Sequence, residues 1–301
     1  EMRDIMAYQG TKINPTRFSF SQLKFYIILV PMCLFMLLPI VYIINQAFKP
    51  LDELFMFPPR FFVQKPTLKN FEELFRTASS TGIPMSRYLL NSILVTIGTM
   101  ILTLLLVVTS GYALSKKRFR AKRLLLNINQ MALMFVPISV MIPRYLVVVN
   151  LGIDNTIFAH IIPMLATPVG LFLVKQFIDQ IPDSIIEAAK LDGAKDFYII
   201  RRIIIPLVSP ALATVAILTF QAVWNATESS NFYVTDETIK TFAFYMNSLT
   251  ASNFSTATGT VTIAGAGMAA ASSLIMFLPN LIIFIVMQSK VMSTMVHSGI
   301  K

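Results

Sequence analysis

The chain has 301 residues, of which 55% are hydrophobic and 13% are charged, whereas a typical soluble domain carries about 25% charged residues. The formal net charge is +10 and the chain has one cysteine, so no intramolecular disulfide can form. This composition excludes an ordinary soluble domain and predicts a membrane protein.

Uncharged runs long enough to cross a bilayer recur along the chain, since roughly 20 helical residues cross a hydrocarbon core of about 30 Å. The first run is longer than the apolar core of a cleavable signal and follows about two dozen residues of polar arm, so we expect a retained helix. We predict an all-α membrane domain at 25–290, between a cytoplasmic arm at 1–24 and a cytoplasmic tail at 291–301. Its six transmembrane helices are expected at about 25–48, 88–115, 124–149, 155–176, 206–227 and 268–288.

The distribution of Lys and Arg predicts the orientation. Lys116–Arg123, between the second and third predicted spans, has six basic residues in eight, and the N-terminal arm has four. The positive-inside rule therefore places both termini and this basic segment in the cytoplasm. Such a cluster is also typical of a nucleic-acid patch, but contact with anionic lipid headgroups is the favoured interpretation. We expect membrane lipids, and no nucleic acid, as partners.

A charged segment from Glu187 to Pro210 separates the fourth and fifth predicted spans. Upstream, Ser184 and Glu187 have the spacing of a capping box, which predicts a helix start. Gly193 favours the left-handed turn that ends a helix, and Pro206 is expected to stop a second short helix. The sequence therefore predicts a cytoplasmic helix-turn-helix loop at 182–210.

This loop resembles the EAA loop of the membrane subunits of binding-protein-dependent ABC importers. An amphipathic loop helix without a partner is the alternative for the first three residues alone. Further matches are Phe48-Lys49-Pro50, Leu90-Asn91-Ser92, Gly111-Tyr112-Ala113-Leu114 and Trp224-Asn225. The resemblance covers most of the chain and is nearest to the MalG-like permease subunit of maltose-type carbohydrate importers, which have a type I ABC importer permease core. The loop residues that match are Glu187, Ala188, Ala189, Asp192, Gly193, Ala194 and Pro206.

The resemblance implies a function in which this chain is not itself an enzyme. The partners would be a second homologous permease subunit, two ATPase subunits, an extracytoplasmic solute-binding protein and a saccharide. Glu187 would contact a basic residue of the ATPase, Gly193 would allow close approach, and Asp192 would fix the turn through its side chain. The chain has no G-x-x-x-x-G-K-[S/T] loop, so ATP and Mg would be bound by the partner subunits. We expect no cofactor and no metal on this chain.

Residues near the outer ends of two spans are candidates for the substrate path. Arg144 either lines a cavity that favours an acidic saccharide or extends its side chain to the membrane interface. Trp224, Asn225 and Glu228 have the aromatic and polar character that suits sugars, although a solvated external loop would look similar. His160 is expected to be a packed polar residue rather than a proton relay.

Two other classes of transporter are alternatives. A proton-coupled secondary transporter needs acidic residues within its spans, and the six predicted spans contain none. An ABC permease for a non-sugar solute shares the shorter EAA pattern and stays open.

Overall fold

The computed structural model describes residues 23–54, 56–79, 82–254 and 263–298. The predicted N-terminal arm lies outside these residues except at its last two positions, and residues 299–301 of the predicted tail lie outside them as well. Every regular element in the described part is a helix, as predicted.

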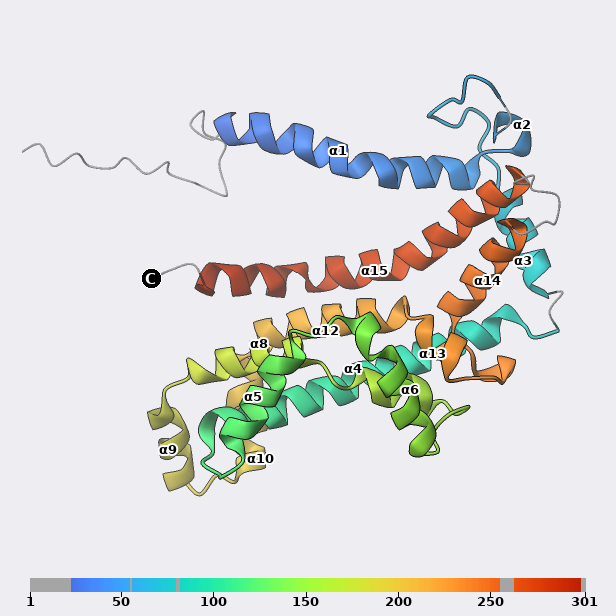
Figure 1. Cartoon of the computed structure of the whole chain (residues 1–301). Coiled ribbons are helices and arrows are strands. Elements are labelled where there is room, and N and C mark those ends of the chain that lie inside the picture. Colours follow the sequence, from blue (N-terminus) through green and yellow to red (C-terminus); the bar gives the residue numbers. More distant parts are fainter. Residues whose placement is uncertain (1–22, 55, 80–81, 255–262, 299–301) are drawn as a thin grey trace, which may run out of the picture.

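The first half of the chain contributes three long helices or helix pairs and several short connecting helices (Figure 1). Their bounds are α1 Leu23–Phe48, α2 Leu51–Leu54, α3 Lys69–Ser79, α4 Met85–Lys116, α5 Lys122–Ala132, η2 Pro137–Val140 and α6 Met141–Asn150. The second half begins with α7 Phe158–Ile161, η3 Ile162–Met164, α8 Pro168–Asp179, α9 Asp183–Leu191, α10 Asp196–Ile199, η4 Ile200–Ile204 and α11 Ile205–Leu207. It ends with α12 Ser209–Trp224, α13 Glu228–Phe232, η5 Glu237–Ile239, α14 Phe242–Phe254 and α15 Ile263–Ser298.

Three of the described helices are long and apolar enough to cross a membrane unaided. They contain Phe25–Phe48, Met85–Lys116 and Gly267–Gln288. Three pairs of shorter helices meet the same criterion only together, and they bend by 114°, 47° and 83° at α5–α6, α7–α8 and α10–α12 respectively. The prediction of six spans therefore requires each bent pair to be one span.

The third predicted span, at 124–149, is not one continuous helix. α5 ends at Ala132, and the chain turns by 114° before α6. Pro137 opens η2, and Val136 before it is extended, with φ −75° and ψ 132°. A residue that precedes proline is forced out of the helical region by the proline ring. Pro137 therefore divides this predicted span into two helical segments, and the span stays a prediction that requires the bent pair to cross the membrane together.

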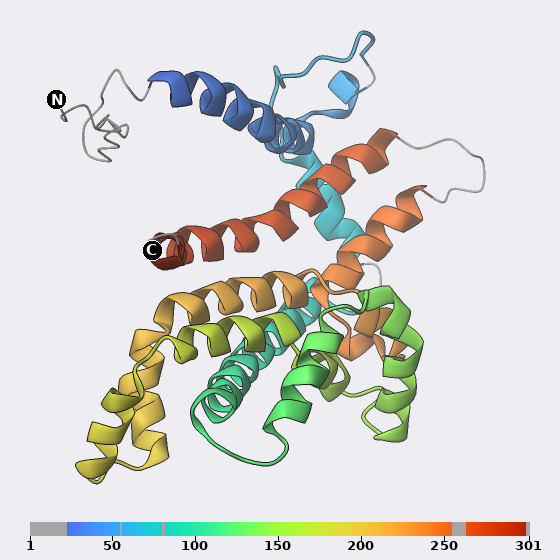
Figure 2. The same ribbon diagram turned by 60° about the vertical axis from the view of Figure 1, so that its left-hand side comes forward.

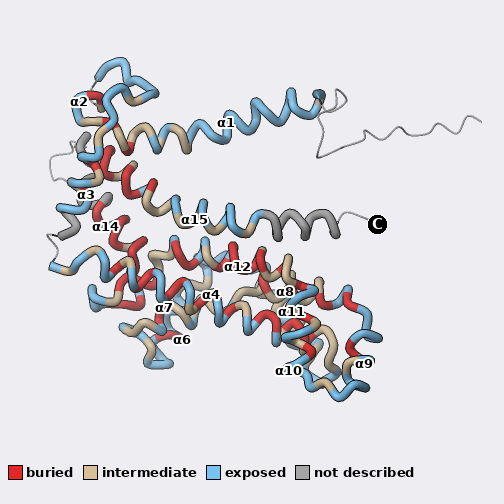
Figure 3. Tube along the Cα trace, turned by 180° about the vertical axis from the view of Figure 1, so that it is seen from behind, coloured by how far each residue is buried: buried red, intermediate tan, exposed pale blue. Residues whose placement is uncertain are grey.

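Helices α4, α8 and α12 pack against one another, and α12 also contacts α15, which in turn contacts α1, α3 and α14. Figure 2 shows the α9–α11 segment extending beyond the packed helices at one end. Figure 3 shows buried positions along α4, α12 and α14, whereas the first half of α1 is exposed. Such an apolar helix surface is suited to lipid rather than water.

Candidate functional site

The α9–α11 segment forms the predicted helix-turn-helix, and its turn is a Schellman motif. The backbone N–H of Ala194 donates to Ala189 O at 2.9 Å, and that of Gly193 donates to Lys190 O at 3.0 Å. Gly193 has φ +82°, a conformation in which other residues are strained. A Cβ atom on Gly193 would meet nothing within 4 Å. Within this chain, Gly193 is therefore needed for its backbone conformation and not for close packing.

Two local expectations for this loop were wrong. α9 begins at Asp183, and its N-cap, Pro182, makes no side-chain capping bond. Ser184 consequently lies inside the first turn, where its hydroxyl is not at the N-cap position of a capping box. The side chain of Asp192 makes no hydrogen bond within the described residues, and the turn is closed by the backbone bonds of the Schellman motif instead.

Pro206 does not stop the second helix, which is a further correction. Ile200–Ile204 form a π-helix, and the N–H of Ile205 donates to Ile200 O. Pro206 follows in the first turn of α11, where the N–H that proline lacks has no required partner. The helical path continues to Leu207 before the chain bends into α12.

The outer face of the loop exposes the residues predicted to couple to an ATPase. Glu187 and Ala188 are exposed, and the Glu187 carboxylate makes no hydrogen bond or ion pair with another described residue. Ala189 and Ala194 are half-buried and pack on the apolar cluster beneath the loop. The small residues therefore bring the two helices together, while the carboxylate of Glu187 stays available to a partner.

A hollow of about 900 Å³ opens between the two helices of the loop. The sequence analysis missed two large apolar side chains of this loop: Phe197, which lines the hollow and is 74% exposed, and Leu191, which ends α9 and is 89% exposed. Exposed apolar groups gathered at one place mark a protein interaction surface. In the sequence, this surface could have been recognised from the aromatic pair Phe197-Tyr198, which shortly precedes Arg201 and Arg202. The hollow is lined by Ala189, Asp192, Gly193, Ala194, Lys195, Phe197, Tyr198, Arg202 and Ile203.

The last turn of α4 contacts three aspartates, one at the end of α8 and one in the first turn of each loop helix. We call this set of contacts the aspartate clasp. The Lys116 ammonium group lowers the pKa of the Asp183 carboxyl below its ordinary value, chiefly through their hydrogen bond. The three contacts are Ser115 Oγ to Asp179 Oδ1 at 2.5 Å, Lys116 Nζ to Asp183 Oδ1 at 2.7 Å, and Lys117 Nζ to both carboxylate oxygens of Asp196 at 2.7 Å.

Arg144 and Glu228, both predicted for the substrate path, lie together at the other end of the molecule. Arg144 Nη1 is 3.3 Å from Glu228 Oε1, and each side chain keeps about 30% or less of its surface exposed. The hydroxyl of Tyr233 donates to the same carboxylate at 3.0 Å. The guanidinium charge is thus balanced within the chain, which weakens the interpretation that Arg144 selects an acidic saccharide.

The other two substrate-path candidates have different surroundings. Trp224 is buried, with its ring stacked on Phe220 at 5.8 Å and its Nε1–H donating to Met276 O at 3.2 Å. It therefore offers no open ring face to a sugar. Asn225 is exposed and lines a hollow of about 460 Å³ between α12, α14 and α15. Amide and hydroxyl side chains supply much of its lining, namely Asn225, Asn247, Ser272 and Ser273.

His160 is packed as expected. Its side chain is buried, with Nδ1 2.7 Å from Ser229 Oγ and Nε2 3.1 Å from Ile239 O. Both ring nitrogens are therefore engaged within the chain. Among the described residues, no group of three or more His, Cys, Asp and Glu side chains is arranged to hold a metal ion.

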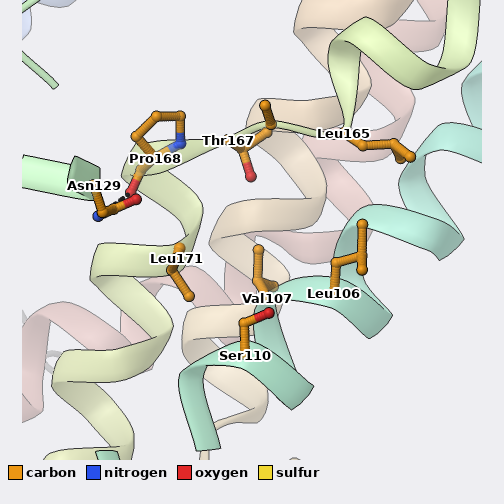
Figure 4. A pocket seen from close by; sticks show the side chains of 9 residues that line it. Leu106, Val107, Ser110, Asn129, Leu165, Thr167, Pro168 and Leu171 are labelled. Carbon is orange, nitrogen blue, oxygen red and sulfur yellow. Dashed lines mark hydrogen bonds between the residues drawn. The ribbon is translucent and has the colours of Figure 1, made fainter. Parts of the chain in front are cut away.

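A smaller hollow, of about 290 Å³, lies between α4, α5 and α8 (Figure 4). It lies where the fourth span bends, and Asn129 Nδ2 donates across it to Pro168 O at 3.3 Å. Ser110 and Thr167 are the other polar side chains among mainly apolar ones. No charged group lines this hollow. It lies at the bend between α7 and α8, and we assign it no binding role.

Comparisons with known proteins agree on one family. The family described as "Binding-protein-dependent transport system inner membrane component" matches residues 107–289, more than half of the chain. The chain is 33% identical to the protein LplC of Bacillus subtilis over 66% of this chain and 65% of LplC. It is 29% identical to the inner membrane ABC transporter permease protein YcjP of Escherichia coli over 93% of this chain and 97% of YcjP.

Two further matches span most of the chain. The trehalose transport system permease protein SugB of Mycobacterium tuberculosis is 26% identical over 88% of this chain and 92% of SugB. The structure also resembles a crystal structure of a bacterial ABC transporter involved in the import of the acidic polysaccharide alginate. That match has a TM-score of 0.73 and 25% identity, and covers 91% of this chain and 98% of the other.

Proposed function

We propose that this chain, which belongs to the family of binding-protein-dependent transport system inner membrane components, is the MalG-like permease subunit of a saccharide importer. Membership of the family makes it a multi-pass permease of the inner membrane and the membrane component of an ABC importer. The ATPase and the solute-binding protein are its partners, and ATP is bound by the ATPase. The finer proposal adds a second homologous permease subunit, two ATPase subunits and a sugar as substrate.

The observation that carries the coupling part of the proposal is the exposed helix-turn-helix loop. Its outer face holds an unpartnered carboxylate at Glu187, and the exposed side chains of Phe197 and Tyr198 line the hollow beside Gly193. A partner with a basic residue and an apolar projection would complement both features. We propose that this partner is the ATPase subunit, with the loop in the cytoplasm. Closure of the ATPase dimer would then move the loop as a rigid unit.

The saccharide part of the proposal is supported by the polar hollow beside Asn225. Amide and hydroxyl groups match the hydroxyls of a sugar, and removing such a group costs a polar ligand its partner. Relatives named for trehalose and diacetylchitobiose uptake support the same substrate class. A non-sugar solute is the alternative.

Substitution of Gly193 tests the coupling role. Gly193→Val should abolish co-purification of the ATPase subunit and uptake, because valine is strained at φ +82°. Gly193→Asn is the matched control, since asparagine tolerates this conformation, and it should retain most of the uptake. Membrane insertion should be equal for both variants. Normal uptake by Gly193→Val would contradict the proposal.

The charge of Glu187 supplies a second test. Glu187→Lys should lower ATPase co-purification at least tenfold, whereas Glu72→Lys, at an exposed site on α3, should leave it unchanged. Uptake from a panel of labelled sugars, amino acids and phosphate into proteoliposomes then tests the substrate class. Uptake of an amino acid or phosphate, and of no sugar, would replace the saccharide proposal with the alternative.

A further inference from the structure

The basic segment after the second span was interpreted as a topology signal at lipid headgroups. Its first two lysines, however, are directed at aspartates of the same chain, 67 and 79 residues further along. Lys116 also donates to the backbone carbonyl of Ile181, at 2.5 Å. These two ammonium groups therefore have partners within the chain.

The order of the clasp follows the chain. Consecutive residues Ser115, Lys116 and Lys117 contact Asp179, Asp183 and Asp196, which lie respectively at the end of α8, in the first turn of α9 and in the first turn of α10. The clasp therefore joins α4 to both sides of the Gly193 turn. It reaches the loop at its base and leaves the turn itself uncovered (Figure 1).

Helix electrostatics favour the two ion pairs of the clasp. The last turn of a helix carries a partial negative charge and the first turn a partial positive charge, so the two lysines at the end of α4 and the aspartates that begin α9 and α10 are stabilised where they stand. Lys122 Nζ completes the end of α4 by donating to Ser115 O at 3.0 Å and Lys117 O at 3.3 Å. The segment that carries Lys116 and Lys117 is thus held on one side by the aspartates and on the other by Lys122.

Apolar packing beneath the clasp also holds α4 against α8 and the loop. Tyr112 is buried in the same cluster as Ile186 and Ile199, and its hydroxyl donates to Asp196 Oδ1 at 3.0 Å. Gly111 lies beside it, and a Cβ there would be only 3.3 Å from Ile178 Cδ1. α4 therefore approaches α8 closely at the height of the clasp.

From this geometry we infer that the aspartate clasp makes the end of α4 one rigid body with the coupling loop. Lys116 and Lys117 are then positioning residues that pass ATPase-driven movement of the loop to α4. Without them, the contacts left between α4 and the loop are the Tyr112–Asp196 hydrogen bond and the apolar packing beneath it. The inference rests on the proposed coupling function, because the loop must be moved by an ATPase for the clasp to transmit anything.

The test measures the distance between α4 and α9 in the assembled importer. Replacing Cys33, the only cysteine, with serine allows spin labels at Leu102→Cys on α4 and Ser184→Cys on α9, both exposed positions. Distances are recorded by electron double resonance without nucleotide and after trapping with ATP, Mg²⁺ and vanadate. In the otherwise unchanged chain, the distance should be the same in both states, with a narrow distribution.

Lys117→Glu should broaden the trapped distribution at least twofold, while the rate of ATP hydrolysis stays within about twofold. The swapped pair Lys117→Glu with Asp196→Lys should restore the narrow distribution. Arg120→Glu is the matched control, because it makes the same charge change in the same segment at a residue without an ion pair to another described residue. It should leave the distribution unchanged.

Different outcomes refute different claims. An α4–α9 distance that changes on trapping in the unchanged chain would overturn the rigid body. Broadening by Arg120→Glu equal to that by Lys117→Glu, or no rescue by the swapped pair, would reduce the clasp to an effect of net charge. Failure of the ATPase subunit to co-purify with the unchanged chain would refute the proposed function itself.

Discussion

The two ends of α4 are fastened by different chemistry. At its first turns, Asn91 is buried and donates to two backbone carbonyls, Thr238 O at 2.8 Å and Lys240 O at 3.0 Å. Ser92 is also buried and accepts from the N–H of Phe242 at 2.7 Å. At its last turn, the clasp joins lysines to carboxylates, most of which are exposed.

The difference in bonding indicates which end of α4 stays in place. Neutral bonds to buried backbone groups are costly to leave unmade, so the end at Asn91 resists rearrangement. Surface ion pairs contribute only about 0–1 kcal/mol each and weaken with salt. The end at the clasp is therefore held by weaker, charge-dependent contacts, and because these join it to the coupling loop it moves with the loop. In the proposed mechanism, α4 pivots about its neutral end and follows the loop at its charged end.

The largest expected effect is at the neutral end. Asn91→Ala removes a donor from the buried carbonyl of Lys240 and one of the two donors to the carbonyl of Thr238, which Arg87 Nε also contacts at 3.2 Å, and should lower the free energy of unfolding by about 1–3 kcal/mol. Thermal unfolding of the purified protein in detergent measures the loss. Asn150→Ala, at an exposed position at the end of α6, is the control and should leave the unfolding temperature unchanged. Equal unfolding temperatures for both variants would mean that the hydrogen bonds of Asn91 do not hold the first turns of α4 in place.

A second prediction concerns Arg144, which lies near the neutral end but belongs to a charge pair. Arg144→Gln breaks the contact with Glu228 and should cost about 1 kcal/mol or less, since Tyr233 still donates to the carboxylate. Because the charge is already balanced, uptake of neutral and anionic sugars should fall equally. A selective loss of anionic sugar uptake would restore the hypothesis that Arg144 chooses an acidic substrate.

Much of this fold follows from local sequence signals. The spans containing α1, α4 and α15 were predicted from uncharged length, and the Gly193 turn from the backbone freedom of glycine. Both signals are read within a few turns of one helix. The break at Pro137 was also local, but the prediction passed over it because the run around it is uncharged.

The remainder depends on contacts between distant residues. Lys117 and Asp196 are 79 residues apart, and no local pattern pairs one lysine of a basic segment with one aspartate of a loop. Trp224 looked like a ring available to a sugar, yet α15 supplies the carbonyl that binds its indole N–H. The accommodation of Pro206 depends on the π-helix before it, which a rule for standard helices does not anticipate.

A smaller effect is expected from ionic strength, which should distinguish the two ends of α4. Raising salt from 0.1 M to 1 M shortens the screening length from about 10 Å to about 3 Å, which weakens exposed ion pairs. A spin label at Ser184 on α9 should gain mobility, whereas one at Thr235, beside the neutral end, should not, because its surroundings are fastened by hydrogen bonds to Asn155. Equal gains at both labels would mean that the clasp does not depend on charge.

The same label at Ser184 should respond little to pH between 5 and 8. The contact with Lys116 lowers the pKa of Asp183, so its carboxylate stays charged at every pH above the ordinary aspartate value of about 3.9. The contribution of the pair is therefore fully present across this range and is lost only as the pH falls through the lowered value. A gain in label mobility between pH 8 and pH 5 would mean that a group other than Asp183 controls the contact.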